Sequence, residues 1–116
     1  MKIENIFVHG LNEEVIFYIG KNKNENFDVI DKGDSDDLWF HANNIPSCHV
    51  VAIIPKGLSK KDIKYIVKMG ALLCKQNTNK IKDYETTEII YTQIKYIEKT
   101  SIPGLVKVTN KKCIKI

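Results

Sequence analysis

The sequence predicts an α+β fold, an antiparallel β-sheet packed against one main helix, within a single domain over residues 1–116. Three observations support this prediction. Two short strand-like runs open the chain, a helical repeat of apolar residues fills 59–75, and alternating runs return from residue 88 to the C-terminus. The length of 116 residues, 43% of them hydrophobic, suits one domain with a modest core and leaves no room for a second.

The first two strands are expected at 4–11 and 14–20, because the two residues between them suit the turn of a hairpin. A loop rich in glycine and amide side chains follows. Asn24 is a suitable N-cap for a short helix near 24–32, and Gly33 suits its end. We therefore expect a hairpin that leads into a brief helix.

A second pair of strands is expected at 37–43 and 48–54, because Pro46 and its polar neighbours favour a turn between them. Side chains alternate between the two faces of a strand. The first strand therefore has an apolar face with Leu38, Phe40 and Ala42, and a polar, aromatic face with Trp39, His41 and Asn43. An indole, an imidazole and a carboxamide on one side indicate a face that does more than fill a core.

The clearest helix is expected over 59–75, reaching about Gln76, because Ser59 and Asp62 form a capping box and apolar residues then follow a helical period. Its outer side carries a ridge of lysines spaced four residues apart: Lys60, Lys64 and Lys68. A long strand is predicted over 88–98. The segments 105–108 and 113–116 are predicted to pair with each other as a closing hairpin.

The charge of the chain is unevenly distributed. Residues 1–40 contain four lysines and nine acidic residues, whereas residues 41–116 contain fourteen lysines and five acidic residues. A basic surface of this kind suits a polyanion such as nucleic acid. A compositional bias towards lysine, as in proteins encoded by an AT-rich genome, explains the same counts. Charge alone leaves both interpretations open. All eighteen basic residues are lysine. The chain therefore lacks the arginine guanidinium groups that recognise guanine edges through paired hydrogen bonds, which disfavours sequence-specific binding.

Catalytic and metal sites are not expected. Cys48, Cys74 and Cys113 lack the spacing of a disulfide framework or a zinc site, so we expect reduced thiols and no cofactor. Cys48 and His49 are adjacent in a strand and must point to opposite faces, which excludes a shared proton between them. His41 and His49 can approach each other, yet their spacing is not typical of a metal pair.

Other polar groups have ordinary explanations. The acidic pair Asp36-Asp37 before a strand is typical of a solvated edge or a cap for backbone amides. No apolar stretch is long enough to cross a bilayer and no signal-peptide pattern is present, so we expect no membrane partner and a cytoplasmic location. Trp39 suits either a stacking platform for a base or a core position, and periodicity favours the core.

Three motifs together resemble a known family. The runs 20–26, 37–41 and 45–51 are similar in order and spacing to the NFACT-R domain, the RNA-binding module of NFACT proteins, and above all to its small stand-alone coiled-coil-domain-containing relatives. The likeness extends to the helix at 59–75 and to 103–106. The residues that match the family pattern are Gly20, Lys21, Asn22, Asn26, Asp37, Trp39, His41, Ser47, His49 and Val50; Cys48 replaces the usual small residue.

This resemblance implies a non-enzymatic nucleic-acid-binding domain whose partner is RNA, either tRNA or ribosomal RNA, with DNA as an alternative. It also implies a link to translation or to ribosome-associated quality control, and a possible ribosome partner. A different class of function, a protein-interaction module whose sheet edge or Trp39 face docks a larger assembly, stays open at this point. Charge reversal of the lysine ridge would separate RNA binding from apolar docking.

The predicted contacts fall into two groups. Phosphates are expected to meet Lys21, Lys23, Lys56, Lys60, Lys64 and Lys68. Sugar or base is expected to meet Asn22, Trp39, His41 and His49, while Asn26 belongs to the family's loop pattern. We expect these lysines to form a single cationic patch beside the indole and the imidazoles. No catalytic residue and no metal ligand is predicted.

Overall fold

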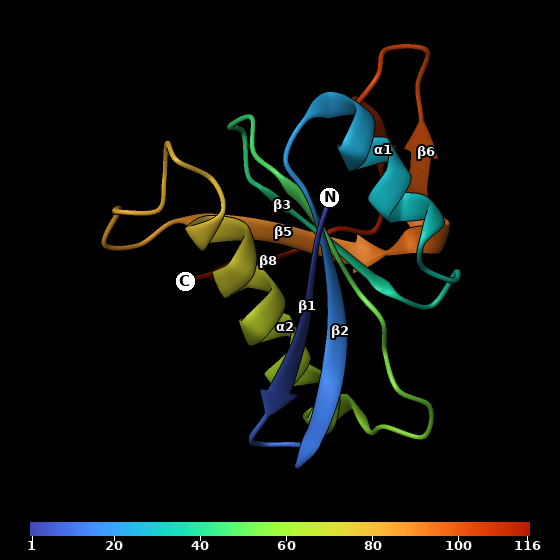
Figure 1. The fold of residues 1–116 in the computed structure, drawn as a ribbon, viewed down its shortest axis with the longest axis vertical. Helices are drawn as coiled ribbons and strands as arrows, with labels where there is room; N and C mark the ends of the chain where they lie inside the picture. The colour runs from blue at the N-terminus through green and yellow to red at the C-terminus, as the bar shows by residue number, and fades with distance from the viewer.

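A six-stranded antiparallel sheet forms the centre of the molecule, in the order β1-β2-β4-β3-β5-β8 (Figure 1). The structure is a computed structural model that describes residues 1–116. Its strands are β1 Lys2–Val8, β2 Glu13–Gly20, β3 Leu38–Ala42, β4 His49–Ala52, β5 Glu88–Gln93 and β8 Lys112–Lys115. A second sheet contains β6 Ile97–Lys99 and β7 Val106–Val108. With helices α1 Lys23–Asp31 and α2 Lys60–Gln76, the predicted α+β class is confirmed.

Two helices cover opposite faces of this sheet. In Figure 1, α1 and α2 lie on separate sides of the crossing strands. The alternation of β3 explains the division, because Phe40 joins the main core packed against α2, whereas Trp39 joins a smaller cluster with Val29 and Ile30 of α1. The two faces predicted from the sequence of this strand are therefore confirmed.

The helix α2 begins as predicted. The Ser59 hydroxyl accepts a hydrogen bond from the Asp62 N–H, and the Asp62 carboxylate accepts one from the Ser59 N–H, each at 3.2 Å. Its buried side includes Gly70, and an added Cβ there would come within 2.3 Å of the Phe40 ring. Close packing of α2 on the sheet depends on this glycine.

The short helix α1 has a different cap from the one expected. Asn22, with an extended backbone (φ −144°, ψ 171°), accepts a hydrogen bond from the Glu25 N–H at 2.9 Å. Asn24 lies inside the first turn, and the helix spans Lys23–Asp31. The prediction of Asn24 as cap was wrong because an N-cap needs non-helical backbone angles, which Asn22 has.

The C-terminal region differs most from the prediction. The expected strand over 88–98 breaks after Gln93 into a 3-10 turn, Ile94–Tyr96, before β6 begins. The expected hairpin is absent, because β7 pairs with β6 and β8 pairs with β5. Alternation in a short strand shows its two faces and leaves its partner unspecified. The Thr92 hydroxyl, which donates to the carbonyls of Thr109 and Asn110 at 3.2 Å each, fixes the crossing between the sheets.

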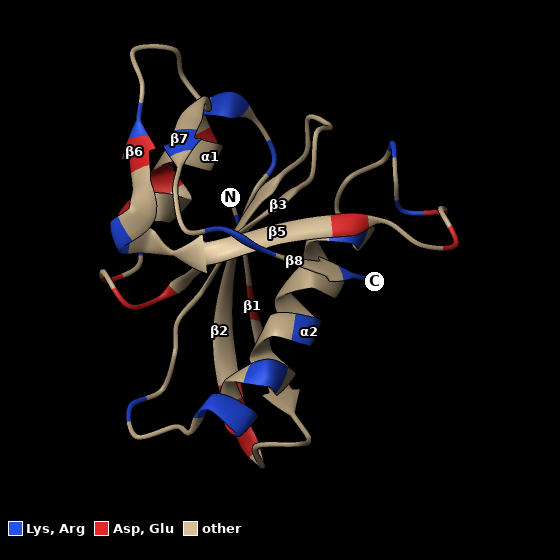
Figure 2. Ribbon diagram, turned by 180° about the vertical axis from the view of Figure 1, so that it is seen from behind, with Lys and Arg blue, Asp and Glu red and all other residues tan.

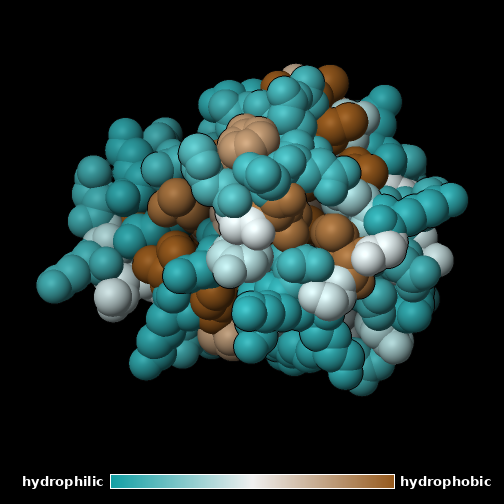
Figure 3. Space-filling view, turned by 90° about the horizontal axis from the view of Figure 1, so that it is seen from below, coloured by the Kyte–Doolittle hydropathy of each residue, from teal (hydrophilic) through white to brown (hydrophobic).

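The face of the molecule seen from below is mainly hydrophilic (Figure 3). Figure 3, a view from below, shows apolar side chains in small areas between polar ones. Large exposed apolar residues include Ile3 and Phe7 of β1, and Leu105 in the loop before β7. Leu105 also lines a pocket.

Candidate nucleic-acid interface

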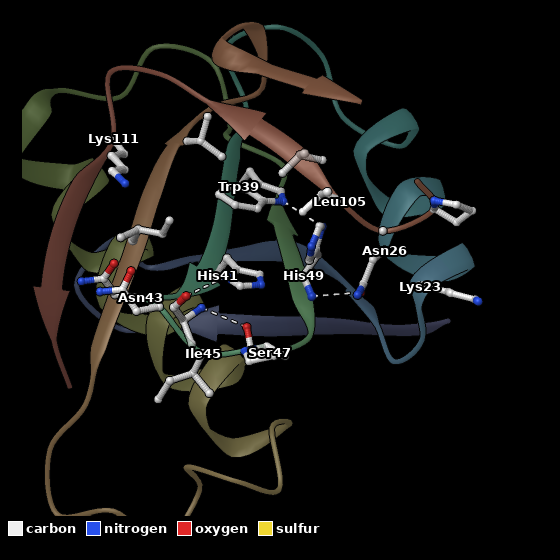
Figure 4. Close-up of a pocket in the computed structure, with 18 residues that line it drawn as sticks. Lys23, Asn26, Trp39, His41, Asn43, Ile45, Ser47, His49, Leu105 and Lys111 are labelled. Atoms are coloured by element: carbon white, nitrogen blue, oxygen red, sulfur yellow. Dashed lines mark hydrogen bonds between the residues drawn. The ribbon is translucent and has the colours of Figure 1, made fainter. Parts of the chain in front are cut away.

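A pocket of about 540 Å³ opens on the α1 side of the sheet. Its walls come from α1, from β3 and β4 with the turn that joins them, from β5, and from the segment between β6 and β8 (Figure 4). Residues from three of the family-like motifs therefore meet at one place. The polar lining residues are Lys23, Asn26, His41, Asn43, Asn44, Ser47, His49 and Lys111.

Three rings form the base of this pocket. Trp39 is 1% exposed, and its Nε1–H donates to His49 Nδ1 at 3.1 Å. His41 lies parallel to Trp39, with 8° between the ring planes and 5.7 Å between the centroids. His49 stands edge-on to both rings, 5.2 Å from Trp39 and 5.1 Å from His41. Trp39 thus supports the two imidazoles from within the core and offers no face on which a base can stack.

Both imidazoles are neutral at pH 7. Burial lowers the pKa of His41 below its ordinary value. Burial, with a smaller contribution from neighbouring His41, lowers the pKa of His49 to about 3. A buried site disfavours the charged form of a histidine because the imidazolium loses its hydration there. The pocket therefore presents uncharged ring nitrogens.

Asn26 and Gly20 hold the pocket together. The Asn26 side-chain oxygen accepts a hydrogen bond from the His49 backbone N–H at 3.0 Å, which ties α1 to the start of β4. A Cβ at Gly20 would lie 2.6 Å from that oxygen, so only glycine fits there. Asn26 is 9% exposed and Asn22 caps α1. Both have structural roles that the sequence did not reveal, whereas a contact to nucleic acid stays a prediction for each.

The acidic pair before β3 has the ordinary role expected of it. The buried Asp37 accepts hydrogen bonds from the N–H groups of Asp34 (2.7 Å) and Ile54 (2.8 Å). Asp36 is exposed and forms an ion pair with Lys95 at 3.2 Å. Asp37 therefore fixes the entry of the chain into β3 and hence the position of Trp39.

Cys48 and His49 point to opposite faces, as predicted. The Cys48 backbone N–H donates a hydrogen bond to Thr78 Oγ1 at 3.3 Å, and the Cys48 Sγ lies 3.5 Å from the carbonyl oxygen of Cys74 in α2. His49 lies in the pocket on the other side.

No three side chains of His, Cys, Asp or Glu gather in a group that can hold a metal ion. No helix has the length and apolar character needed to cross a bilayer.

The predicted lysines do not form one patch. Lys23 lines the pocket, and Lys21 lies exposed just before α1. Lys60 and Lys64 line a different groove of about 530 Å³. Figure 2 shows the basic segments of α2 well apart from α1. The expectation of a single cationic patch was wrong, because α1 and α2 cover opposite faces of the sheet.

The other predicted residues can be placed in the same way. Lys68 is exposed on α2, and Lys56 is exposed in the turn that precedes it. Neither lysine lines the pocket, so the structure does not bring them together with Lys23. We use the name α2 ridge for Lys60, Lys64 and Lys68.

Sequence reasoning missed Lys111 and the wall formed by the segment 103–106. Gly104 adopts φ +81°, and a Cβ there would lie 2.8 Å from Lys23 Cβ and 2.9 Å from Lys23 Cα. This glycine lets the segment pack directly on the start of α1 and close one side of the pocket. The Pro103-Gly104 pair was visible as part of the family resemblance, but Lys111 carried no local signal.

The comparisons with known proteins agree with this architecture. Residues 5–108 match the family model described as NFACT protein RNA binding domain. The chain is 35% identical to coiled-coil domain-containing protein 25 of Danio rerio over 85 residues, which cover 72% of this chain and 41% of that protein. It is 35% identical to the coiled-coil domain-containing protein 25 homolog of Dictyostelium discoideum over 92 residues, which cover 78% and 45%. The chain therefore spans less than half the length of these relatives.

A solved structure shows the same fold. The C-terminal part of the fibronectin/fibrinogen-binding protein from Streptococcus suis superposes with a TM-score of 0.80 and 24% sequence identity. The match covers 100% of this chain and 45% of that one. At this identity the similarity supports the fold alone.

Proposed function

The chain belongs to the NFACT protein RNA binding domain family, and from this premise we propose that it binds RNA at the pocket on the α1 side of the sheet, without catalysing a reaction. The contacting residues proposed are Lys21, Lys23, His41, His49 and Lys111. Lysines hold backbone phosphates as point charges, and the neutral imidazoles meet sugar or base.

One observation supports this assignment above all. The residues that line the pocket include two lysines, Lys23 and Lys111, and no aspartate or glutamate. The remaining lining is apolar or carries neutral donors and acceptors. A concave site with a positive rim and no carboxylate favours an anionic chain that carries uncharged groups, which describes RNA.

The α2 ridge has a secondary part in this proposal. Its lysines are exposed on the far side of the sheet, so they do not reach the RNA segment that lies in the pocket. They raise the general attraction of the domain for a polyanion, or meet a second segment of a large folded RNA. Lys56 belongs with this group.

The finer identity of the partner follows the family resemblance. We propose tRNA or ribosomal RNA as the natural ligand, in translation or ribosome-associated quality control in the cytoplasm. The curated relatives are longer than this chain. The cellular role is therefore a proposal that goes beyond RNA binding by this domain. DNA shares the phosphate backbone and is the competitor against which the preference has to be measured.

Titrating the purified domain with tRNA, single-stranded RNA and duplex DNA at two salt concentrations tests the proposal. We expect tighter binding to RNA than to duplex DNA. Phosphate contacts of Lys21, Lys23 and Lys111 give a slope of log K against log salt of about −2, at about −0.7 per contact. Absence of RNA binding, or a flat salt dependence, would contradict the proposal.

A further inference from the structure

Hydrogen bonds fix the tautomer of both histidines in the pocket. His49 Nδ1 accepts from the Trp39 N–H, so the ring proton of neutral His49 must sit on Nε2. His41 Nδ1 lies 2.6 Å from the Ala42 carbonyl oxygen, which can only accept, so the proton of neutral His41 sits on Nδ1. His49 therefore offers a donor at Nε2, and His41 offers an acceptor at Nε2.

Both Nε2 atoms are free to meet a ligand. None of the side-chain hydrogen bonds of the structure uses the Nε2 of either ring. No enclosed side-chain nitrogen or oxygen of the protein lacks a partner. Since both rings line the pocket, each Nε2 borders the pocket space, His41 from a half-buried ring and His49 from a ring that is only 2% exposed. Figure 4 shows the two rings close together. Their centroids lie 5.1 Å apart.

The surroundings suit an uncharged group that has charged groups on either side of it. Burial keeps both imidazoles neutral. Apolar side chains of Ile90 and Leu105 form part of the walls. In Figure 4, Lys23 and Lys111 lie on opposite sides of the ring cluster, so an anionic chain that crosses the pocket can meet one lysine on either side.

We propose that this pocket holds a single unpaired nucleobase of the RNA, read through a neighbouring donor and acceptor on its edge. His41 Nε2 accepts a hydrogen bond from a base N–H, and His49 Nε2–H donates to a ring nitrogen or carbonyl oxygen of the same base. Lys23 and Lys111 contact the phosphates on its two sides. A base in a duplex has this edge occupied by its partner, so the pocket selects single-stranded segments, loops and ends.

This inference rests on the proposed function, and one set of ligands separates the two. The ligands are a single-stranded RNA hexanucleotide, the same hexamer without bases, and an RNA duplex of equal length. A donor–acceptor pair on a base edge corresponds to roughly tenfold or more in affinity, which we expect for the hexanucleotide over the other two. Equal binding of hexamers with and without bases overturns the inference and leaves RNA binding intact. If none of the three binds, the proposed function itself fails.

A variant locates the effect. His41→Phe keeps an aromatic ring beside Trp39 and removes the acceptor, so we expect the hexanucleotide to lose about tenfold in affinity while the baseless hexamer is unaffected. His9→Phe is the matched control, because His9 is exposed beside Phe7 and does not line the pocket. An unchanged affinity of folded His41→Phe for the hexanucleotide would contradict the inference.

A measurement on the unaltered protein keeps the test valid if His41→Phe does not fold. In nitrogen-15 spectra of the imidazoles, the Nε2 resonances of His41 and His49 should shift on adding the hexanucleotide. The baseless hexamer should leave both resonances in place. Shifts of equal size with both ligands would show contact with the backbone alone and would overturn the inference.

Discussion

The two faces of the sheet perform different tasks with the same strands. On the α2 side, Phe40 belongs to a main core of 17 buried residues. On the α1 side, the buried cluster has four members, and its Trp39 makes a hydrogen bond to a histidine that lines a pocket. One residue of sequence separates Phe40 from Trp39. The difference indicates that the residues buried on the α2 face mainly stabilise the fold. Some of the residues buried on the α1 face also position the polar groups of the pocket.

The largest expected effect tests the stability role of the α2 face. Phe40→Ala removes a fully buried ring from the main core and leaves a cavity. We expect a loss of about 3–5 kcal/mol in the free energy of unfolding, measured by urea denaturation. Pocket residues on the other face keep their contacts, so any folded fraction should still bind RNA. A loss below about 1 kcal/mol would contradict the central role given to this core.

The pH dependence of stability tests the α1 face. His49 has a pKa of about 3 when folded and 6.5 when unfolded, so between these values the unfolded chain binds more protons. The free energy of unfolding should therefore fall as the pH is lowered from 6.5 to 4.5, by up to about 1.4 kcal/mol per pH unit for this group. His41 adds in the same direction. Constant stability over this range would contradict burial of neutral imidazoles.

A smaller effect is expected from Trp39→Phe, which keeps a large ring and removes the indole N–H. His49 Nδ1 then lacks its donor in a buried position, at a cost of roughly 1–3 kcal/mol in unfolding free energy. The tautomer of His49 is no longer fixed, so RNA affinity should fall as well. Loss of stability without loss of RNA affinity would separate Trp39 from the binding site.

The smallest effect concerns the ion pair that links α1 to the second sheet. Lys99 of β6 donates to both oxygens of Asp31 at 2.7 and 2.8 Å and lies 5.3 Å from the centre of the Phe27 ring. The pair is exposed, so Asp31→Asn should change stability by about 1 kcal/mol or less, and less again in high salt. A change of several kcal/mol in thermal unfolding would show that α1 depends on β6 far more than its exposed contacts indicate.

Local signals in the sequence predicted most helices and strands. They did not predict which strands pair or on which face of the sheet each helix packs. The capping box of Ser59 and Asp62 located α2, and alternation assigned Trp39 and Phe40 to opposite faces. The partner of β7 could not be predicted, because three alternating residues fit several neighbours equally well. The cationic patch failed for a related reason. Helical spacing aligns Lys60 with Lys64 on one helix, but it carries no information about the face of the sheet on which that helix packs.

The site shows the same limit. His41 and His49 were chosen from their spacing and from the family resemblance, and the structure places both in the pocket. The roles of Asn22 as helix cap and of Asn26 as backbone acceptor depend on contacts that only folding creates. Lys111 lies 88 residues after Lys23, and only the return of the chain through β6 and β7 brings both to one pocket.

Two charge-reversal variants show whether RNA binds at the pocket or at the α2 ridge. Lys23→Glu with Lys111→Glu changes the pocket, and Lys60→Glu with Lys64→Glu changes the α2 ridge. The net charge shifts equally in both, so general attraction for RNA is matched. In titrations with single-stranded RNA, we expect a loss in affinity of about tenfold or more for the pocket variant and a clearly smaller loss for the ridge variant. Equal losses, or a larger loss for the ridge variant, would contradict it.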